Sequence, residues 1–339
     1  MRNSLVFIFI IIFTVIASGQ EPYTYVDPLI GTAPAGTISA KRHSETGSED
    51  KGQTFPGVGT PFGMTQWTPE TRTTEIKCIA PYYYNDRFIT GFRGSHWMSG
   101  SCTQDYGSMT LMPFTTMQPD TIKKSPVSSY SHDNEISEPA YYSVLLNDSG
   151  VEAELAGYVR TGMMRFTFPG EKLSCIFLRA NSDENVGYIR LEKNMIICSN
   201  PVHRIYQGRG RSAGFSGWFV IMFDKPFTEI RNDLSSQNMV ISFGKEKNVT
   251  AFIGTSFTSA EAALRNLSAD APDRDFDKLR IETEDTWNRT LGKVMVKGGS
   301  EEDKIKFYTA LYHCYQLPRI ASDADGSYQG FAEDTVIHK

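Results

Sequence analysis

The amino-acid sequence predicts a mainly β fold, a large antiparallel β-sandwich that is followed by two helical stretches. Across residues 87–257, short segments alternate apolar and polar side chains with a period of two, as strands with one buried face do. Turn residues separate these segments. After Thr258 the apolar spacing changes to three or four residues, which indicates helices. Many short strands before a helical region are typical of a sandwich with appended helices.

Residues 1–20 have the pattern of a secretory signal peptide. Arg2 precedes an apolar run over residues 5–16, and the small residues Ala17, Ser18 and Gly19 follow the run. The run is short for a membrane span, and no stop-transfer pattern follows it. We therefore expect a secreted or periplasmic protein with no membrane span after signal removal. An uncleaved membrane anchor is the alternative.

The mature chain holds few cysteines but several sequons. The cysteines are too scattered for a disulfide framework and lack the close pairs of a zinc site. One or two bridges are permitted in an exported protein, and the sequence does not choose between pairings. Sequons accept glycans if the source cell is eukaryotic. Those of this chain stand at Asn147, Asn248, Asn266 and Asn288.

Glycine and proline dominate residues 25–64 on either side of a polar insertion at residues 38–51. Both residue types interrupt helices, so we predict loops and short extended pieces here, with the insertion solvated. The pattern GxxxxGK[ST] does not occur in this region. A phosphate-binding loop is therefore disfavoured.

The predicted sandwich domain spans residues 21–257, and the strand pattern occupies residues 87–257 of it. Residues 147–150, Asn-Asp-Ser-Gly, connect two strand-like segments and are typical of a hairpin. Residues 214–223, GFSGWFVIMF, are apolar on both faces, which predicts a central strand covered by a second layer.

Two helices are predicted after the sandwich. Ser300 can cap the second one, acidic residues follow it, and Pro318 ends it. We therefore divide the remainder into a helical linker at residues 258–299 and the opening of a helical domain at residues 300–339. The residues after Pro318 contain no predicted element, so we expect the chain to be cut short. The first helix has one apolar face, made by Phe276, Leu279, Thr283, Trp287 and Leu291.

Charge argues against a nucleic-acid partner. The chain carries 34 basic and 39 acidic residues, a formal net charge of -5. No basic stripe is present that would neutralise a phosphate backbone.

Residues 91–113, GFRGSHWMSGSCTQDYGSMTLMP, form the most informative stretch of the chain. Their glycines, small polar residues and aromatic rings are typical of a binding loop on a rigid scaffold. A tryptophan beside small polar residues suits a neutral, hydroxyl-rich ligand, because the ring covers the apolar face of a sugar. The alternative is that Trp97 is a buried side chain in an ordinary connection between strands.

Four ordered motifs extend this interpretation. The runs VDPLIGT, GQTFPGVGTPFGM, SHWMSGSCTQDYG and FYTALYHCYQLPRIASDADGSYQGF follow one another between Val26 and Phe331, and the resemblance that they carry extends from about Val26 to the last residue. In this order the chain resembles glycoside hydrolase family 92. The resemblance implies a calcium-dependent, exo-acting α-mannosidase that inverts anomeric configuration. It also implies a β-sandwich, a helical linker and a C-terminal (α/α)6 barrel, of which residues 300–339 are an incomplete beginning with its first helix.

The resemblance also implies where the chemistry lies. An inverting glycosidase needs a carboxylic acid and a carboxylate on opposite sides of the scissile bond. In the family both groups and the calcium site belong to the barrel, so we expect them beyond Lys339 and assign no catalytic or metal-binding residue in this chain. We interpret residues 323–326, Asp-Ala-Asp-Gly, as a polar turn and not as a calcium loop. The implied partners are mannose-containing glycans and the chain's own C-terminal barrel.

By the same resemblance, loops of the sandwich supply one wall of the sugar pocket. Trp97 is the predicted stacking platform of the leaving-group subsite, which suits α-1,2 linkages, and His96 lies beside it. Many family members carry a His-Leu-Ser-Gly run where this chain has His-Trp-Met-Ser-Gly. A glycan-binding module without chemistry is the alternative function. The other predicted substrate-binding residues are Asp105, Cys102, Phe55 and Gly57.

Overall fold

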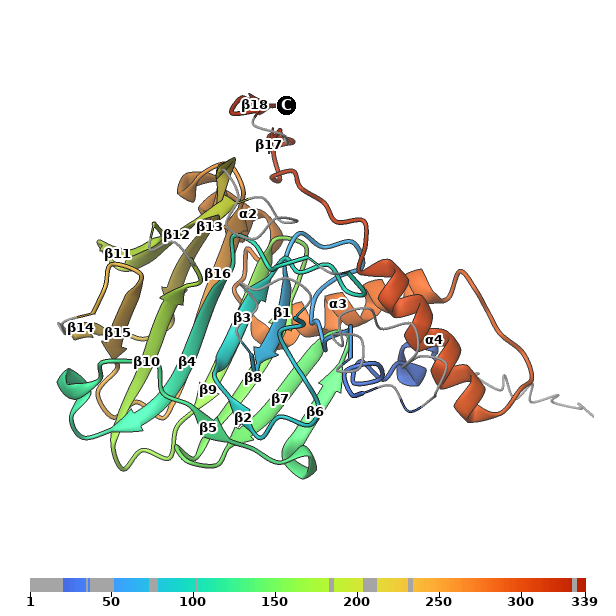
Figure 1. Ribbon diagram of the computed structural model, residues 1–339, viewed down its shortest axis with the longest axis horizontal. Coiled ribbons are helices and arrows are strands. Elements are labelled where there is room, and N and C mark those ends of the chain that lie inside the picture. The colour runs from blue at the N-terminus through green and yellow to red at the C-terminus, as the bar shows by residue number, and fades with distance from the viewer. Residues whose placement is uncertain are drawn as a thin grey trace, which may run out of the picture.

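The protein is two β-sheets packed face to face, with helices following them in the chain (Figure 1). The structure is a computed structural model. It describes residues 21–34, 36, 52–72, 79–101, 103–182, 186–203, 212–230, 234–330 and 334–339.

Both large sheets are antiparallel, so the predicted mainly β sandwich is confirmed. The six-stranded sheet has the order β1 (Gln66–Glu70), β3 (Gly91–Ser95), β4 (Met109–Thr116), β10 (Leu173–Ala180), β15 (Asn238–Ser242) and β14 (Thr228–Ile230). The eight-stranded sheet has the order β11 (Tyr188–Glu192), β12 (Met195–His203), β13 (Ser212–Phe223), β16 (Asn248–Ser256), β9 (Thr161–Thr167), β8 (Val151–Gly157), β7 (Tyr141–Leu146) and β6 (Glu135–Glu138).

Short elements complete the described fold. Two small antiparallel pairs join β2 (Phe88–Ile89) to β5 (Ser128–Ser129) and β17 (Tyr328–Gln329) to β18 (Ile337–His338). The 3-10 helices are η1 (Pro22–Tyr25), η3 (Pro119–Thr121) and η4 (His132–Asn134).

The main core fills the space between the two large sheets. Phe92 of β3 and Phe166 of β9 meet there with ring centroids 6.3 Å apart. Trp67 of β1 lies against β9 so closely that a Cβ at Gly162 would approach its ring to 2.0 Å. Its Nε1 donates to the carbonyl oxygen of Thr161 at 3.1 Å. The sandwich therefore closes around a tryptophan that only a glycine can accommodate.

Helices α2 (Ala260–Asp270) and α3 (Phe276–Leu291) pack on the outer face of the eight-stranded sheet. A Cβ at Gly254 of β16 would lie 2.1 Å from the carbonyl oxygen of Ala263 in α2, so this glycine permits the close approach. The helix also explains why β13 is apolar on both faces. Its neighbours β12 and β16 lie beside it, the main core lies under one face, and α2 covers the other.

Helix α4 (Glu301–Tyr315) begins as predicted, with a capping box in which the Ser300 and Asp303 side chains satisfy each other's backbone amides. It docks on residues 52–64, the glycine-rich loop, where the Tyr312 hydroxyl donates to the carbonyl oxygen of Gly57 at 2.6 Å. From α3, Trp287 Nε1 donates to the carbonyl oxygen of Gly59 at 2.7 Å. Backbone carbonyls of this loop therefore accept hydrogen bonds from both helices.

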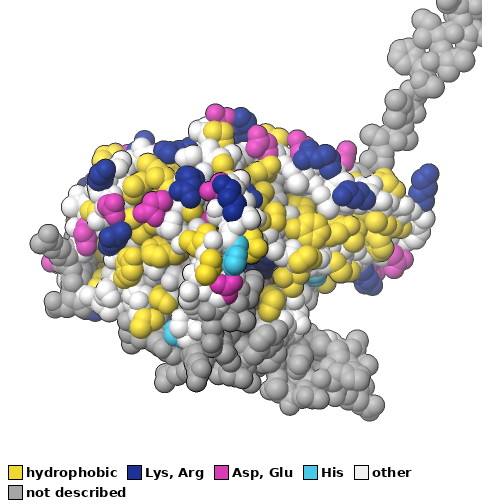
Figure 2. All heavy atoms as spheres, turned by 90° about the horizontal axis from the view of Figure 1, so that it is seen from above, with side chains coloured by type: hydrophobic (Ala, Val, Ile, Leu, Met, Phe, Trp, Pro, Cys, Tyr) yellow, Lys and Arg dark blue, Asp and Glu magenta, His cyan; other side chains and the backbone are white. Residues whose placement is uncertain are grey.

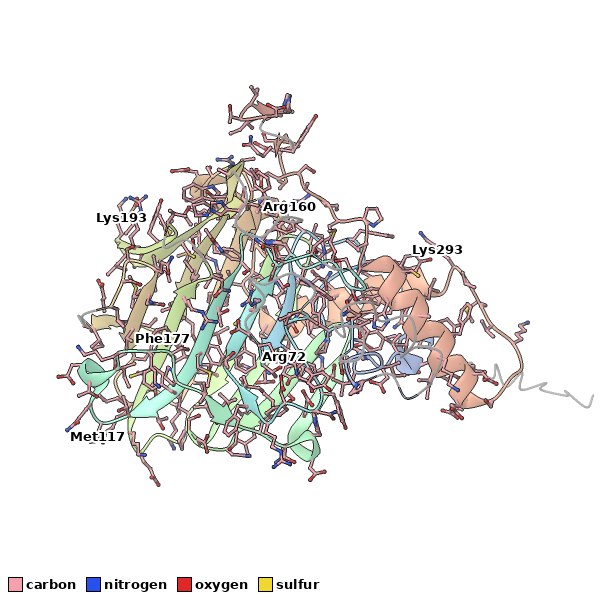
Figure 3. All side chains as sticks on the ribbon, in the orientation of Figure 1. Arg72, Met117, Arg160, Phe177, Lys193 and Lys293 are labelled. Carbon is pink, nitrogen blue, oxygen red and sulfur yellow. The ribbon has the colours of Figure 1, made fainter. Side chains whose placement is uncertain are left out.

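The segment after α4 runs back along the sandwich. Arg160, in the turn between β8 and β9, donates through Nε to the carbonyl oxygen of Ser322 at 2.7 Å and pairs with Asp270 of α2 (Figure 3). The sequence predicts no element here, yet β17 and β18 pair in this segment. Two-residue strands are too short for periodicity to detect.

Hydrophobic side chains also reach the surface. Seen from above, they form a band on the side of the molecule where α3 and α4 lie (Figure 2). Exposed apolar residues of this part of the chain include Val294, Met295 and Phe307. Within the described residues, the helices are too short or too polar to cross a membrane. The predicted signal peptide, residues 1–20, lies outside the described residues.

Candidate functional site

The loop that the sequence singles out connects β3 to β4 and is held by Asp105. One carboxylate oxygen of Asp105 accepts from the backbone amides of His96 at 2.9 Å and Tyr106 at 2.8 Å. The other accepts from Ser95 Oγ at 2.9 Å and Arg93 Nη1 at 3.2 Å. Both oxygens are therefore occupied, and the side chain is buried. Asp105, predicted to bind substrate, holds the backbone of the loop through these contacts.

Below the loop lies a buried ionic network. Arg93 donates to Asp105 and, through Nε, to Glu70 Oε2 at 2.8 Å. Burial would raise the pKa of Glu70, but the guanidinium groups of Arg93 and Arg179 and the hydroxyl of Thr110 lower it to about 2. Glu70 is therefore ionised at neutral pH. The network anchors β1, β3, β4 and β10 beneath the loop.

His96 is buried and neutral. Burial lowers its pKa to about 4, against the opposing effect of Asp105. A neutral ring satisfies both contacts if Nδ1 donates to the carbonyl oxygen of Tyr106, at 2.8 Å, and Nε2 accepts from Thr65 Oγ1, at 3.0 Å. The ring links the loop to the sandwich and, in this arrangement, has no nitrogen left for a ligand.

The indole of Trp97 is also buried. Its Nε1 donates to the carbonyl oxygen of Thr103 at 2.9 Å, and its ring meets Phe55 edge to face at 5.8 Å. A stacking platform needs an exposed ring face. The placement of Trp97 matches the alternative interpretation, a packed side chain that stabilises the loop, and gives no support to the stacking role.

The structure describes two of the three remaining predicted substrate-binding residues, Phe55 and Gly57. Phe55 is buried against Trp97, so these two lie together. Gly57 lies where α4 docks, and a Cβ there would approach Gln66 Oε1 to 2.9 Å and Gln316 Nε2 to 3.0 Å. Cys102 lies outside the described residues.

A hollow of about 550 Å³ opens beside this loop. Met98 and Tyr106 of the loop form part of its wall, and the segment after α4 forms another part. The wall is mostly apolar, and Arg319 is the charged residue in it. The lining residues are Met64, Met98, Tyr106, Phe215, Phe257, Leu317, Pro318, Arg319, Ile320 and Ala321.

Arg319 connects the segment after α4 to the loop between β3 and β4. Its Nη2 donates to the carbonyl oxygen of Trp97 at 2.5 Å, and its Nε lies 3.4 Å from the carbonyl oxygen of Gln316. Burial lowers the pKa of the guanidinium, while Tyr106 and Asp105 oppose that effect. Sequence reasoning did not single out Arg319, Tyr106 or Met98. All three lie in motifs that resemble the family, but no sequence pattern distinguishes them from the residues around them.

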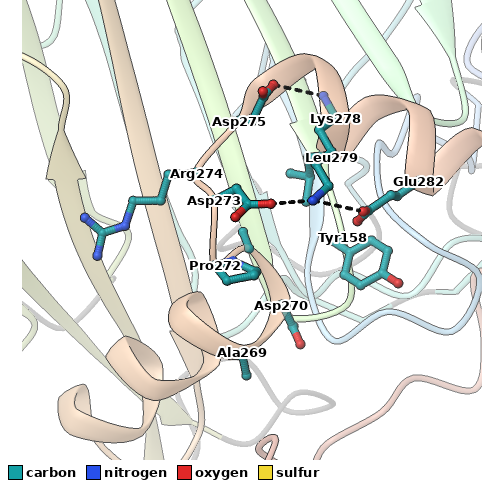
Figure 4. A pocket seen from close by; sticks show the side chains of 11 residues that line it. Tyr158, Ala269, Asp270, Pro272, Asp273, Arg274, Asp275, Lys278, Leu279 and Glu282 are labelled. Atoms are coloured by element: carbon teal, nitrogen blue, oxygen red, sulfur yellow. Dashed lines mark hydrogen bonds and ion pairs between the residues drawn. The ribbon is translucent and has the colours of Figure 1, made fainter.

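A second hollow, of about 260 Å³, lies between α2 and α3 (Figure 4). Its wall includes Asp270, Asp273, Lys278 and Glu282. These charges are paired: Lys278 contacts Asp273 and Glu282, and Asp270 pairs with Arg160. The paired charges leave no concentration of free carboxylates for a cation.

The described residues do not fit a calcium site. They contain no group of three or more His, Cys, Asp or Glu side chains that could hold a metal ion. In the Asp-Ala-Asp-Gly turn, Asp323 accepts from Asn266 Nδ2 at 2.7 Å and Thr258 Oγ1 at 2.5 Å. Asp325 accepts from the Ser327 amide at 3.0 Å. The polar turn predicted from the sequence is what the structure contains.

Comparison with known proteins identifies the family. A model of the glycosyl hydrolase family 92 N-terminal domain matches residues 25–261, and a model of the glycosyl hydrolase family 92 catalytic domain matches residues 262–339. The chain belongs to glycosyl hydrolase family 92. The hollow lies where the two matched parts meet, because five of its lining residues, between Met64 and Phe257, belong to the first part and residues 317–321 belong to the second.

Individual relatives agree with this family. A secreted glycosidase from Arthroderma benhamiae is 24% identical over 87% of this chain and 41% of its own length. An inverting mannosidase of family GH92 from Bacteroides thetaiotaomicron VPI-5482 is 25% identical, with a TM-score of 0.76 over 94% of this chain and 43% of that one.

A second structure in the family holds a bound ligand. It is a GH92 α-mannosidase from Bacteroides thetaiotaomicron in complex with mannoimidazole, 26% identical, with a TM-score of 0.74 over 94% of this chain and 43% of that one. The chain therefore spans less than half the length of the relatives it matches.

Proposed function

We propose that this chain is the N-terminal part of a secreted, exo-acting α-mannosidase that hydrolyses terminal mannose of N-glycans or mannans with inversion. We place its preference at α-1,2 linkages and its calcium site in the barrel. The family supports glycoside hydrolysis, and the structural neighbours that are named mannosidases support the substrate class. We divide the chain into a sandwich at residues 21–257, a linker at 258–299 and the start of the barrel at 300–339.

Two buried carboxylates near the hollow and the turn after α4, Asp105 and Asp323, support an acid-base pair that lies elsewhere. The acid and base of an inverting glycosidase stand roughly 6.5–9.5 Å apart, with room for a water molecule between them and the sugar. Asp105 and Asp323 are buried, and hydrogen bonds to neighbouring protein groups engage both oxygens of each. We therefore assign acid and base to the barrel beyond residue 339.

We propose that the sandwich contributes to substrate binding through the hollow. The composition of its wall is the observation on which the proposal rests. Its wall presents apolar and aromatic groups from Met98, Tyr106 and Phe257 beside one guanidinium group, Arg319. Apolar surface with a few polar groups is the composition that binds sugar rings. We propose that the leaving-group sugar contacts this wall, while the buried residues His96, Trp97 and Asp105 hold the loop in place.

A substitution that fills the hollow tests this role in the complete enzyme, with the barrel that we propose to follow residue 339. Met98→Trp is expected to lower kcat/KM for an α-1,2-linked mannobiose about tenfold, equivalent to about 1.4 kcal/mol of transition-state stabilisation. Hydrolysis of p-nitrophenyl α-mannoside, whose leaving group is not a sugar, should change much less.

The matched control is Met117→Trp, since Met117 is exposed and lies at the far end of β4 (Figure 3). It should leave both substrates unaffected. Equal losses of activity on both substrates in Met98→Trp would contradict a leaving-group role for the hollow.

A further inference from the structure

The four sequons occupy different environments in the folded chain. Asn147 and Asn248 are exposed, Asn288 is half-buried, and Asn266 has no exposed surface. A glycan is a bulky polar group that needs solvent around it. The structure thus separates acceptor sites that look alike in the sequence.

Asn147 lies in the turn between β7 and β8. Gly150 closes this turn with a positive φ of 69° and donates its amide to the carbonyl oxygen of Leu146 at 2.8 Å. The backbone amide of Asn147 donates to the carbonyl oxygen of Ser129 at 2.9 Å. The turn is therefore held by backbone contacts, and the side-chain amide is not needed to hold it.

Asn248 is the first residue of β16, directly opposite Thr167 at the end of β9. Its Oδ1 accepts from Thr167 Oγ1 at 3.3 Å, a contact that leaves the nitrogen available. N-glycosylation modifies Nδ2, so a sugar at this position keeps the contact to Thr167.

Asn266 differs because its whole amide is used inside the protein. Its Nδ2 donates to the carbonyl oxygen of Thr255 at 2.8 Å and to Asp323 Oδ1 at 2.7 Å. Its Oδ1 accepts from the amide of Ala324 at 2.8 Å. A glycan would replace one of the two donated hydrogens and force apart α2, β16 and the turn after α4. A molecule modified here cannot reach this fold.

We propose that Asn147 and Asn248 are N-glycan acceptor sites of this protein, and that Asn266 is not. The proposal rests on export through a eukaryotic secretory pathway and is independent of hydrolase activity. Asn288, whose Oδ1 accepts from the Tyr23 amide at 3.2 Å at the contact between α3 and η1, forms no part of it.

Both acceptor sites lie at the same end of the eight-stranded sheet. The β7–β8 turn and the first residue of β16 stand next to the end of β9, which pairs with both β8 and β16. Arg160 and α2 lie at the opposite end of these strands. Since β8 is 7 residues long, the two ends are about 23 Å apart. Glycans at Asn147 and Asn248 would therefore leave α2 and the segment after α4 uncovered.

Production of the chain with its own leader in a eukaryotic secretory host tests the proposal. Secreted chains, and protease-resistant chains from the microsomes, are treated with peptide N-glycosidase F in heavy-oxygen water, and each sequon is scored by peptide mass spectrometry. We expect heavy-oxygen-labelled aspartate at positions 147 and 248 and unmodified asparagine at position 266.

Three hydroxyl variants provide matched controls, because each removes a sequon and keeps its asparagine. Ser149→Ala and Thr250→Ala should each reduce the intact mass by one oligosaccharide. Ser268→Ala should leave it unchanged; Ser268 is exposed, and its hydroxyl donates only to the Leu264 carbonyl oxygen at 3.1 Å. Folded protein with a glycan on Asn266, or without one on Asn147 or Asn248, would overturn the assignment of that site.

Discussion

At the scale of single residues, buried side chains hold the predicted sugar-binding loop in place. Asp105 holds two backbone amides, His96 bridges the loop to Thr65, and Trp97 packs against Phe55. These residues are polar or aromatic, as binding residues are, but their hydrogen-bonding groups and ring faces are directed into the protein. They position the loop, and Met98 and Tyr106 form the surface that it presents to the hollow.

The buried, neutral His96 makes stability depend on pH. Its pKa is about 4 in the folded chain, below the ordinary value of 6.5, so the unfolded chain binds its proton first as the pH falls. Stability from His96 is therefore present above pH 6.5 and is lost as the pH falls from 6.5 to 4. We expect this loss to be on the order of 3 kcal/mol.

Urea unfolding at a series of pH values measures this effect. His313 has the same lowered pKa, about 4, so the contribution of His96 is the difference between the wild type and His96→Gln. The variant should show a shallower loss of stability between pH 6.5 and 4. Parallel curves for the two proteins would show that His96 is not a buried neutral base.

At the scale of elements, the attachment of α4 to the sandwich decides how the hollow is formed. Tyr312 donates to Gly57, and Gln316 donates to the Tyr312 hydroxyl at 2.8 Å. The segment that follows carries Arg319 back to the loop at Trp97. The attachment of α4 to Gly57 therefore helps to set the position of the segment after α4 that lines the hollow.

Removal of the Tyr312 hydroxyl tests the contribution of the contact between α4 and Gly57. Tyr312→Phe leaves the buried carbonyl oxygen of Gly57 without its donor and should lower the free energy of unfolding by about 1–3 kcal/mol. Tyr328→Phe is the matched control, because Tyr328 is exposed, and should change stability by less than about 0.5 kcal/mol. Differential scanning calorimetry compares the two. Equal stabilities would mean that the contact between α4 and Gly57 contributes nothing.

At the scale of the whole molecule, the chain combines a two-sheet sandwich with a few helices that match the catalytic-domain model. The sandwich buries its own core, whereas hydrophobic side chains remain on the surface near α3 and α4 (Figure 2). Contiguous exposed apolar patches are typical of docking surfaces. This arrangement agrees with the proposal that chemistry is carried by a neighbouring barrel.

The corresponding prediction concerns activity. The polypeptide of residues 21–339 should not hydrolyse p-nitrophenyl α-mannoside, with or without calcium, because we place the acid-base pair outside it. Release of p-nitrophenolate is followed against buffer and against the complete enzyme as a positive control. Turnover well above buffer by the purified polypeptide would mean that a catalytic pair lies within these residues.

Much of the architecture could be predicted from local sequence. Alternation of apolar residues over residues 151–155 and 164–168 predicted the strands that became β8 and β9, and the Ser300 cap predicted the start of α4, because periodicity and capping depend on neighbours in the chain. The ordered motifs predicted the family for the same reason, since each is a short contiguous run. The two-residue strands β17 and β18 lie below the length at which periodicity can be read.

The site depended on contacts between residues that are far apart in the chain. Phe55 packs against the ring of Trp97, so the exposure of that ring depends on a residue far away in the chain. Arg319 lines the same hollow as Met98 because of the position in which α4 docks. Likewise, four sequons are equivalent as sequence, but only Asn266 meets both Thr255 and Asp323. The sequence by itself determined the fold class and the family; the tertiary structure decided exposure, because burial depends on which distant segments pack against a side chain.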